Sequence, residues 1–519
     1  MKAKAFFLVL FFIPCFLVAN TLEFQSPTFE EPYFRILFSL EVGLDNMLFK
    51  GVRLNGERWE NFLVFQEGKR ADLSKPLVKG TYDFLVDYAW MSKKDYEVLV
   101  LLQAEGSTEI KGERIRGASP DKGGIPSNRE GFYRIFVAEE TAGLQRKGEI
   151  ACLTLTVPKA EFGNDSFVIF DGDFLVDCQI LDVKESTPPE QIANSHPVTK
   201  TYKVAIPVDI SPWEKKMYLV LKGERASTLP QGFTITGEGI GKTVKGKFLS
   251  LEFHPQSGQI NIIETEGVRL YNEAGVIHWN PDVFIPGVAW DHSFDWSPPP
   301  SYEEKNGIFI YTNSRRGPFK TIKDATLEVK YTMEAYSPYF LSETMVRVDK
   351  DLGIIALRND EMVLYKELFD TLIYRAKSGK VIKIPLEEKP QAPYGLVHIA
   401  PDDADWVGLL NTKEMYGFFS LRIKYTNSRV APSGDWLHKP GTYFYAPSDG
   451  KYVYWVRPLL YTWGEFLTSN LLTFVPAGST FYEKNAYIIL PLEKKFFGIS
   501  FTKKLDLLLE KLRNPVRIY

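Results

Sequence analysis

The segment Val276–Trp296 concentrates aromatic and polar side chains of the kinds that recognise sugars. It holds three of the chain's ten tryptophans and two of its six histidines. A sugar site needs flat apolar rings that stack on the CH-rich face of a pyranose, beside polar groups that bind its hydroxyls. The segment supplies both kinds: His278, Trp279, Asp282, Trp290, His292, Asp295 and Trp296. We therefore expect a carbohydrate site here. In the alternative, the tryptophans plug the end of a β-sandwich and the histidines satisfy backbone groups.

Two further clusters repeat this mixture nearer the C-terminus. They are His398, Asp402, Asp403, Asp405 and Trp406, and then Asp435, Trp436 and His438. The three acids of the first cluster can supply oxygen ligands, but their spacing does not match a known calcium loop. We interpret them as a solvated turn and predict no metal site. Trp406, Trp436 and His438 stay candidates for contact with a sugar.

The segment Tyr452–Arg457 has the alternating pattern of a β-strand. Period-two alternation sends Tyr452 and Tyr454 to one face and Trp455 and Arg457 to the other. We expect one face to line a groove, where Arg457 is a candidate ligand, and the other face to enter the core.

The overall composition excludes several classes of function. The chain has 519 residues, with 62 basic and 65 acidic side chains and a formal net charge of -3. This balance lacks the positive field that a phosphate backbone demands, so we do not expect nucleic-acid binding. The sequence contains no Walker loop, Gly-x-Ser-x-Gly elbow, His-Glu-x-x-His or paired Cys-x-x-Cys motif, and we predict no cofactor.

Residues 1–20 have the order of a signal peptide. Two lysines precede the apolar run Phe6–Val18, and the small residue Ala19 follows it. No later segment reaches the roughly 18 apolar residues that span a bilayer. We expect a protein that is secreted, periplasmic or at the cell surface, without a membrane span after cleavage. Cys152 and Cys178 then form either a disulfide or two free thiols.

Short apolar segments separated by Gly, Pro and Asn turns recur along the chain and predict an all-β protein. A short C-terminal helix is expected at Lys503–Leu512, where four leucines have helical spacing. The length favours about three domains. We place them at 21–140, 141–260 and 261–519, with a proline-rich linker at 184–199.

Several stretches resemble known carbohydrate-related folds. Leu327–Phe340 and Leu357–Glu361 are similar to the β super-sandwich of galactose-mutarotase-like proteins. Asp405–Lys413 looks like the version of this fold in polysaccharide lyases. Glu140–Pro158 and Phe170–Phe174 are similar to the small β barrel that precedes the sandwich in rhamnogalacturonan-lyase-like proteins. The resemblance implies a small barrel, a C-terminal super-sandwich and a polysaccharide or oligosaccharide partner.

The resemblance to lyases implies abstraction of the C5 proton of a uronate. That reaction needs a base with a pKa near neutrality and a cation that neutralises the carboxylate. We expect His278 or His292 as the base and His398 as the acid partner. The candidate carboxylate clamps are arginines, whose planar fork meets a carboxylate through two bonds: Arg315, Arg316 and Arg358. The rival hypotheses are a non-catalytic glycan-binding protein and a structural protein of the cell envelope.

Overall fold

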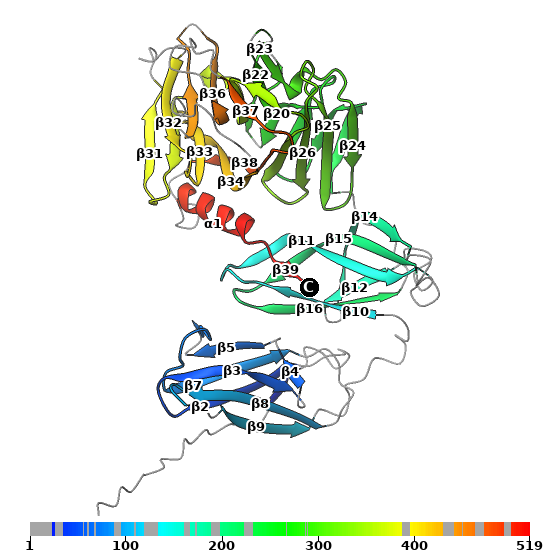
Figure 1. The fold of residues 1–519 in the computed structure, drawn as a ribbon, viewed down its shortest axis with the longest axis vertical. Coiled ribbons are helices and arrows are strands. Elements are labelled where there is room, and N and C mark those ends of the chain that lie inside the picture. Colours follow the sequence, from blue (N-terminus) through cyan, green and yellow to red (C-terminus); the bar gives the residue numbers. More distant parts are fainter. Residues whose placement is uncertain are drawn as a thin grey trace, which may run out of the picture.

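The computed structural model describes most of the chain from residue 23 to residue 519. The longest stretches outside the described residues are 1–22, 26–34, 88–94, 119–132, 160–166, 188–197, 223–231, 387–394, 429–440, 462–471 and 493–499. The predicted signal peptide and the candidates Trp436 and His438 therefore lie outside them. The described part is mostly β-structure with one C-terminal α-helix, which confirms the predicted all-β class (Figure 1). No helix of this part is long and apolar enough to cross a membrane.

The N-terminal unit is a sandwich of two antiparallel sheets (Figure 1). One sheet has the order β1 (Glu23–Gln25), β2 (Arg35–Val42), β7 (Gly80–Asp87), β5 (Phe62–Gln66) and β6 (Lys69–Arg70). The other has the order β4 (Glu57–Trp59), β3 (Met47–Leu54), β8 (Asp95–Ala104) and β9 (Ile110–Ala118). Alternate residues point inward, so Leu40 of β2 and Val100 of β8 share one core.

The middle unit also has two sheets. The first has the order β13 (Phe174–Val176), β12 (Phe167–Asp171), β16 (Lys215–Lys222), β10 (Tyr133–Glu139) and β39 (Arg517–Ile518). The second has the order β11 (Arg146–Pro158), β15 (Thr199–Ile210) and β14 (Gln179–Ser186). Because β14 and β15 pair in one sheet, the predicted linker at 184–199 joins two strands of the same unit. Its residues 188–197 lie outside the described part.

The two cysteines of the middle unit are free thiols, which resolves the alternative left open by the sequence. Cys178 is packed in the core of the unit, whereas Cys152 is exposed on the outer face of β11. Neighbouring residues along a strand point to opposite faces, and Leu153 next to Cys152 lies in the same core as Cys178. The thiols therefore face away from each other.

The C-terminal unit contains the large sheets. The five-stranded sheet has β17 (Thr234–Glu238), β18 (Gly241–Lys245), β19 (Ser250–Phe253), β20 (Ile260–Thr265) and β21 (Val268–Leu270). The six-stranded sheet has the order β23 (Ala289–His292), β22 (Asp282–Ile285), β29 (Ala356–Tyr365), β36 (Tyr452–Tyr461), β35 (Gly441–Tyr445) and β32 (Leu396–Pro401). The nine-stranded sheet has the order β24 (Ser301–Lys305), β25 (Ile310–Pro318), β26 (Ala325–Glu334), β27 (Tyr339–Val348), β38 (Thr480–Pro491), β34 (Tyr416–Ser428), β33 (Trp406–Asn411), β30 (Thr371–Arg375) and β31 (Val381–Pro385). A two-stranded sheet pairs β28 (Leu352–Ile354) with β37 (Thr473–Val475).

One face of the nine-stranded sheet packs against the five-stranded and six-stranded sheets. Leu327 of β26, Leu357 of β29 and Phe253 of β19 belong to one hydrophobic core, which begins at Phe233. The helix α1 (Phe501–Arg513) lies on the opposite face and begins after the N-cap Ser500. The predicted helix is therefore present, and its buried leucines pack on that face.

Candidate functional site

The register of β22 places charged residues side by side on one face of the six-stranded sheet. Asp282 pairs with His292 of β23 on one side and with Arg358 of β29 on the other. Directly opposite residues in a sheet point to the same face with their Cβ atoms about 5 Å apart. Trp290 shares this face because it lies two residues before His292. We call Asp282, Trp290, His292, Arg358 and Glu361 the Arg358 cluster.

Arg358 is the centre of this cluster. Its Nε lies 3.0 Å from Asp282 Oδ1, and its Nη2 lies 3.2 Å from both carboxylate oxygens of Glu361. Its guanidinium also stacks on Trp290, 3.6 Å from the ring centroid. The arginine is therefore held by two carboxylates and one indole, and it has no free fork for a substrate carboxylate in this arrangement.

A β-bulge brings Glu361 to this face. Residues 358 and 361 would point to opposite faces of a regular strand, but the register between Asn359 and Met362 is irregular. Asp360 has a φ of 48°, in the left-handed region that favours glycine. Its side chain points inward and accepts hydrogen bonds from Ser420, Trp455 and Tyr487. These contacts hold the strained backbone that turns Glu361 toward Arg358.

Glu361 is buried, and burial raises the pKa of its carboxyl well above the ordinary value. Arg358 opposes this rise, whereas the charge of Asp282 and a hydrogen bond with it raise the pKa of Glu361 further. The positive charge of one arginine between two carboxyl groups is balanced when only one of them is ionised and the other keeps its proton. We therefore assign the proton to Glu361.

Glu361→Gln is expected to stabilise the protein more at pH 8.5 than at pH 5. The folded-state pKa of Glu361 is raised above the unfolded value of about 4.5, so folding takes up a proton and stability is lost as pH rises toward the folded pKa. Glutamine imitates the protonated carboxyl and avoids this loss. Urea unfolding at both pH values measures the difference, and Glu328→Gln, at an exposed pair with Arg316, is the control. An equal effect of Glu361→Gln at both pH values would show that Glu361 is ionised in the folded protein.

Partly exposed rings border the Arg358 cluster. Trp279 meets His292 edge to face at 5.4 Å and Phe294 at 5.1 Å, and its Nε1 donates to the carbonyl of Val276. His292 is flanked by two carboxylates, with Nε2 3.4 Å from Asp282 and Nδ1 3.5 Å from Asp295. Together they form a surface on which the rings can contact the CH groups of a sugar and the charged side chains can bind its hydroxyls.

His278 lies elsewhere, in the interior between the sheets. It is fully buried, and its Nδ1 bonds to the hydroxyl of Tyr331, which in turn donates to Gln259 Oε1. Arg315 donates to the same oxygen at 2.8 Å. Burial and the nearby Arg315 lower the pKa of His278 to about 3. The predicted base is thus a neutral core residue, and Arg315 is a buried partner of this network rather than a clamp at the surface.

The three histidines do not meet in one cleft. His292 lies on β23 and His398 on β32, which are the two edges of the six-stranded sheet. Five strand spacings of about 4.8 Å separate these edges by about 24 Å. His398 instead stacks on Tyr374. The catalytic hypothesis built on His278, His292 and His398 required their convergence, which is absent.

Four further predicted ligands have structural contacts. Trp296 is a core residue whose Nε1 donates to the Pro318 carbonyl, and Trp406 is buried beneath α1 with its Nε1 3.0 Å from Asp506. Arg316 points away from Arg315 and pairs with Glu328 on the outer face of the nine-stranded sheet. Arg457 is buried and pairs with Glu483 at 2.7 Å, while Tyr454 lies on the other face of β36. The predicted alternation of this strand is therefore correct, but it takes Arg457 into the interior.

Sequence reasoning missed Glu361 and Phe294. The spacing of a regular strand would point Glu361 away from Arg358, and only the bulge makes the two residues neighbours. Phe294 lies inside the predicted segment, but the sequence analysis assigned the sugar-facing rings to the tryptophans, and no local pattern separates Phe294 from a buried phenylalanine. No cluster of three or more potential metal ligands occurs among the residues that the structure describes.

Comparisons with known proteins do not assign this chain to a family. No protein-family model matches the chain, and no curated protein matches it significantly. Among solved structures, an alpha-mannosidase from Enterococcus faecalis is 11% identical, with a TM-score of 0.47, over 75% of this chain and 46% of its own length. A galactose mutarotase related enzyme from Lactobacillus acidophilus is 8% identical, with a TM-score of 0.30, over 49% of this chain and 98% of its own. The chain thus spans about half the length of the mannosidase.

Proposed function

We propose that this chain is an exported protein that binds a polysaccharide through the Arg358 cluster and the rings beside it. The observation that carries the proposal is the position of Trp279 and Phe294, which are partly exposed next to His292, Asp295 and Arg358. Aromatic faces beside convergent hydrogen-bonding groups are the chemistry that sugars require. Export rests on the signal-like residues 1–20.

Binding is favoured over lyase activity by the state of the arginine. A lyase needs a cation that is free to neutralise the substrate carboxylate, but Arg358 already meets Asp282 and Glu361. The lyase-like resemblance of the middle unit stays a prediction. A second candidate function, acid–base catalysis on the bound sugar, is favoured by the Glu361–Asp282 carboxyl pair beside His292. Glu361→Gln would abolish such turnover while leaving binding intact.

The double variant Trp279→Ala with Phe294→Ala is expected to weaken polysaccharide binding roughly tenfold or more, because each stacked ring contributes about 1 kcal/mol. Affinity electrophoresis in gels that contain neutral or acidic polysaccharides measures this loss. Phe474→Ala is the matched control, because Phe474 is a 62% exposed ring on the separate strand β37.

The thermal unfolding midpoint of each variant separates loss of a site from loss of the fold. Reduced binding at an unchanged midpoint supports the proposal. Equal binding by the double variant and the wild type, or the absence of binding to every polysaccharide by the wild type, would refute it.

A further inference from the structure

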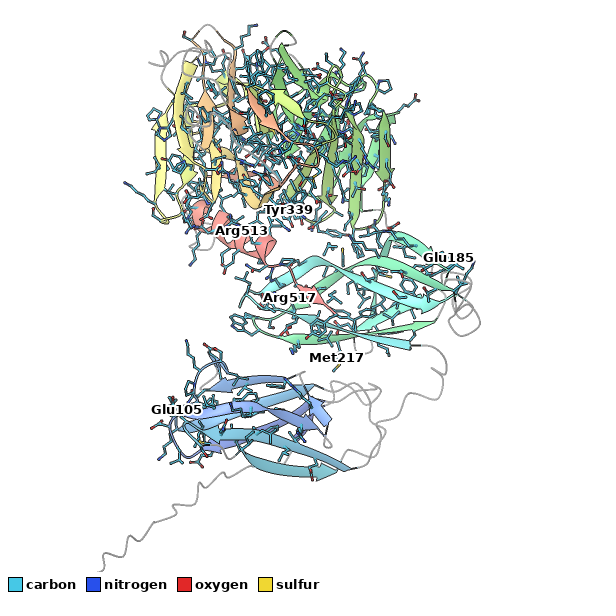
Figure 2. The ribbon with its side chains drawn as sticks, viewed as in Figure 1. Glu105, Glu185, Met217, Tyr339, Arg513 and Arg517 are labelled. Atoms are coloured by element: carbon cyan, nitrogen blue, oxygen red, sulfur yellow. The ribbon has the colours of Figure 1, made fainter. Side chains whose placement is uncertain are left out.

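A cavity of about 650 Å³ lies between the middle unit and the C-terminal unit. One wall is the outer face of the nine-stranded sheet, and the other is the outer face of the sheet β11, β15 and β14. Figure 2 shows Tyr339 and Arg513 on the side of the C-terminal unit that faces the middle unit. The volume lies within the usual range of small-molecule sites.

The walls of this cavity are joined by direct bonds, so the cavity is preformed. Gln179 of β14 accepts from the backbone N–H groups of Phe309 and Ile310 and donates to the carbonyl of Ile310 at 3.0 Å. The C-terminal strand β39 leaves the helix and pairs with β10 in the middle unit. Ala205 also packs with Phe309 and Ile310 at this contact. Ordering of the site would therefore subtract little from the free energy of ligand binding.

The cavity has a surplus of positive charge. Its lining contains six lysines and five acids: Lys147, Lys203, Lys305, Lys330, Lys484, Lys511, Glu149, Asp182, Glu303, Glu334 and Glu343. Glu149 pairs at 2.9 Å with Arg146, which lies outside the lining, whereas the pair of Glu303 with Lys305 at 3.2 Å takes up one acid and one of the six lysines. Glu334 accepts from Ser337 and Tyr339, and burial raises the pKa of its carboxyl.

Three of the lysines line the cavity together with the thiol of Cys152. Burial raises the pKa of the Cys152 thiol, and the charge of Glu334 adds to this rise, whereas Lys203 of β15, Lys330 of β26 and Lys484 of β38 oppose it. Lys330 and Lys484 share one carboxylate, Glu343, at 3.9 and 3.7 Å, which is beyond hydrogen-bond length. Within the described part of the chain, no acidic side chain lies within 4.0 Å of the Lys203 ammonium group. These three cations can therefore receive an anion.

The rest of the lining is suited to hydroxyl groups. Thr312, Ser314 and Thr332 line the cavity from the outer face of the nine-stranded sheet. Tyr336 also lines it, and its ring is 51% exposed. Cations, hydroxyls and an accessible ring together match an acidic sugar, with its carboxylate on the lysines and its pyranose on the ring.

We propose that this cavity is a binding site for a carboxylated oligosaccharide, separate from the Arg358 cluster. The choice of a sugar acid among anions rests on the proposed function, whereas the anion site rests on the lysines alone. The two sites lie on different faces of the C-terminal unit, since the Arg358 cluster belongs to the six-stranded sheet and the cavity to the nine-stranded sheet.

The thiol of Cys152 gives a test that needs no substitution. A short oligogalacturonate should slow alkylation of Cys152 severalfold, as followed by mass spectrometry of its peptide, while Cys178 is buried and stays unreactive. A neutral cello-oligosaccharide of the same length should not protect it. Equal protection by inorganic sulfate would show a general anion site and overturn the sugar assignment. The absence of protection by any anion would overturn the site.

Substitution of the lysines tests the same site by affinity. The triple variant Lys203→Met, Lys330→Met and Lys484→Met should bind the oligogalacturonate about tenfold more weakly in calorimetry, because each screened charge pair contributes modestly. The matched control replaces Lys75, Lys184 and Lys350, which are exposed lysines outside the cavity. Equal loss in both triple variants would overturn the proposal. Trp279→Ala should leave the protection of Cys152 unchanged, which separates failure of this site from failure of the Arg358 cluster.

Discussion

Arg146→Met is expected to lower the free energy of unfolding by about 3–5 kcal/mol, because it leaves a buried carboxylate without its cation. The side chains of Arg146 and Glu140 are both fully buried and meet at 2.8 Å. Burial alone would raise the pKa of Glu140, but hydrogen bonds from Arg146 and from the backbone of Trp213 and Ala142 outweigh it and lower that pKa. Methionine removes the strongest of these donors.

The same substitution is expected to loosen the C-terminal strand. Arg146 donates hydrogen bonds to the carbonyls of Lys511 and Asn514, at the end of α1. These two bonds hold the backbone directly before β39. Hydrogen exchange should therefore accelerate at the amides of Val137 and Tyr519, which bond to each other's carbonyls across β10 and the C-terminus.

Two variants control for this prediction. Arg347→Met breaks an exposed pair with Asp349 and should cost no more than about 1 kcal/mol. Adding Glu140→Gln to Arg146→Met removes the stranded charge and should recover part of the stability. A cost of Arg146→Met as small as that of Arg347→Met would contradict the assigned role, as would unchanged exchange at Tyr519.

His278→Asn is expected to make the C-terminal unit more resistant to acid by about 3 kcal/mol at pH 4. The folded pKa of His278 is about 3, below the value of 6.5 in an unfolded chain. The unfolded state therefore takes up a proton that the folded state refuses, and wild-type stability is lost as pH falls below 6.5. Asparagine does not titrate, so the variant escapes this loss.

Asparagine is chosen because it keeps the donor that the interior uses. Tyr331 donates to Gln259, so the Nδ1–H group of His278 donates to the Tyr331 oxygen. The Asn side-chain amide can donate from nearly the same position. Urea unfolding from pH 7 to pH 4 measures the two profiles. Burial also lowers the pKa of the partly exposed His398, but by less than that of His278, so His398→Asn should give a smaller change in the same direction. Parallel profiles for His278→Asn and the wild type would mean that His278 has the same pKa in the folded protein as in the unfolded chain.

The residues of this sequence determined the strands and helix through local patterns. Leucines at helical spacing indicated the helix that the structure places at Phe501–Arg513. Alternation in Tyr452–Arg457 correctly assigned the two faces of β36. Such patterns depend only on neighbours along the chain, so they can be recognised from the sequence alone. Within Val276–Trp296, the structure places Trp279, Trp290 and His292 at a partly exposed face, while His278 and Trp296 lie in the core.

Only the tertiary structure decided which polar residues meet. A polar side chain in a strand pattern does not indicate whether it will face solvent or another sheet. His278, Arg315 and Arg457 therefore looked like ligands, although His278 and Arg315 join the interior network around Gln259 and Arg457 pairs with Glu483. Glu361 reaches Arg358 only through a bulge, because one extra residue reverses the face of everything after it. The cavity lined by Lys203, Lys330 and Lys484 joins β11 and β15 of the middle unit to β26 and β38 of the C-terminal unit, which are far apart in the sequence. Contacts of that sequence separation depend on how whole sheets pack, and no local period records them.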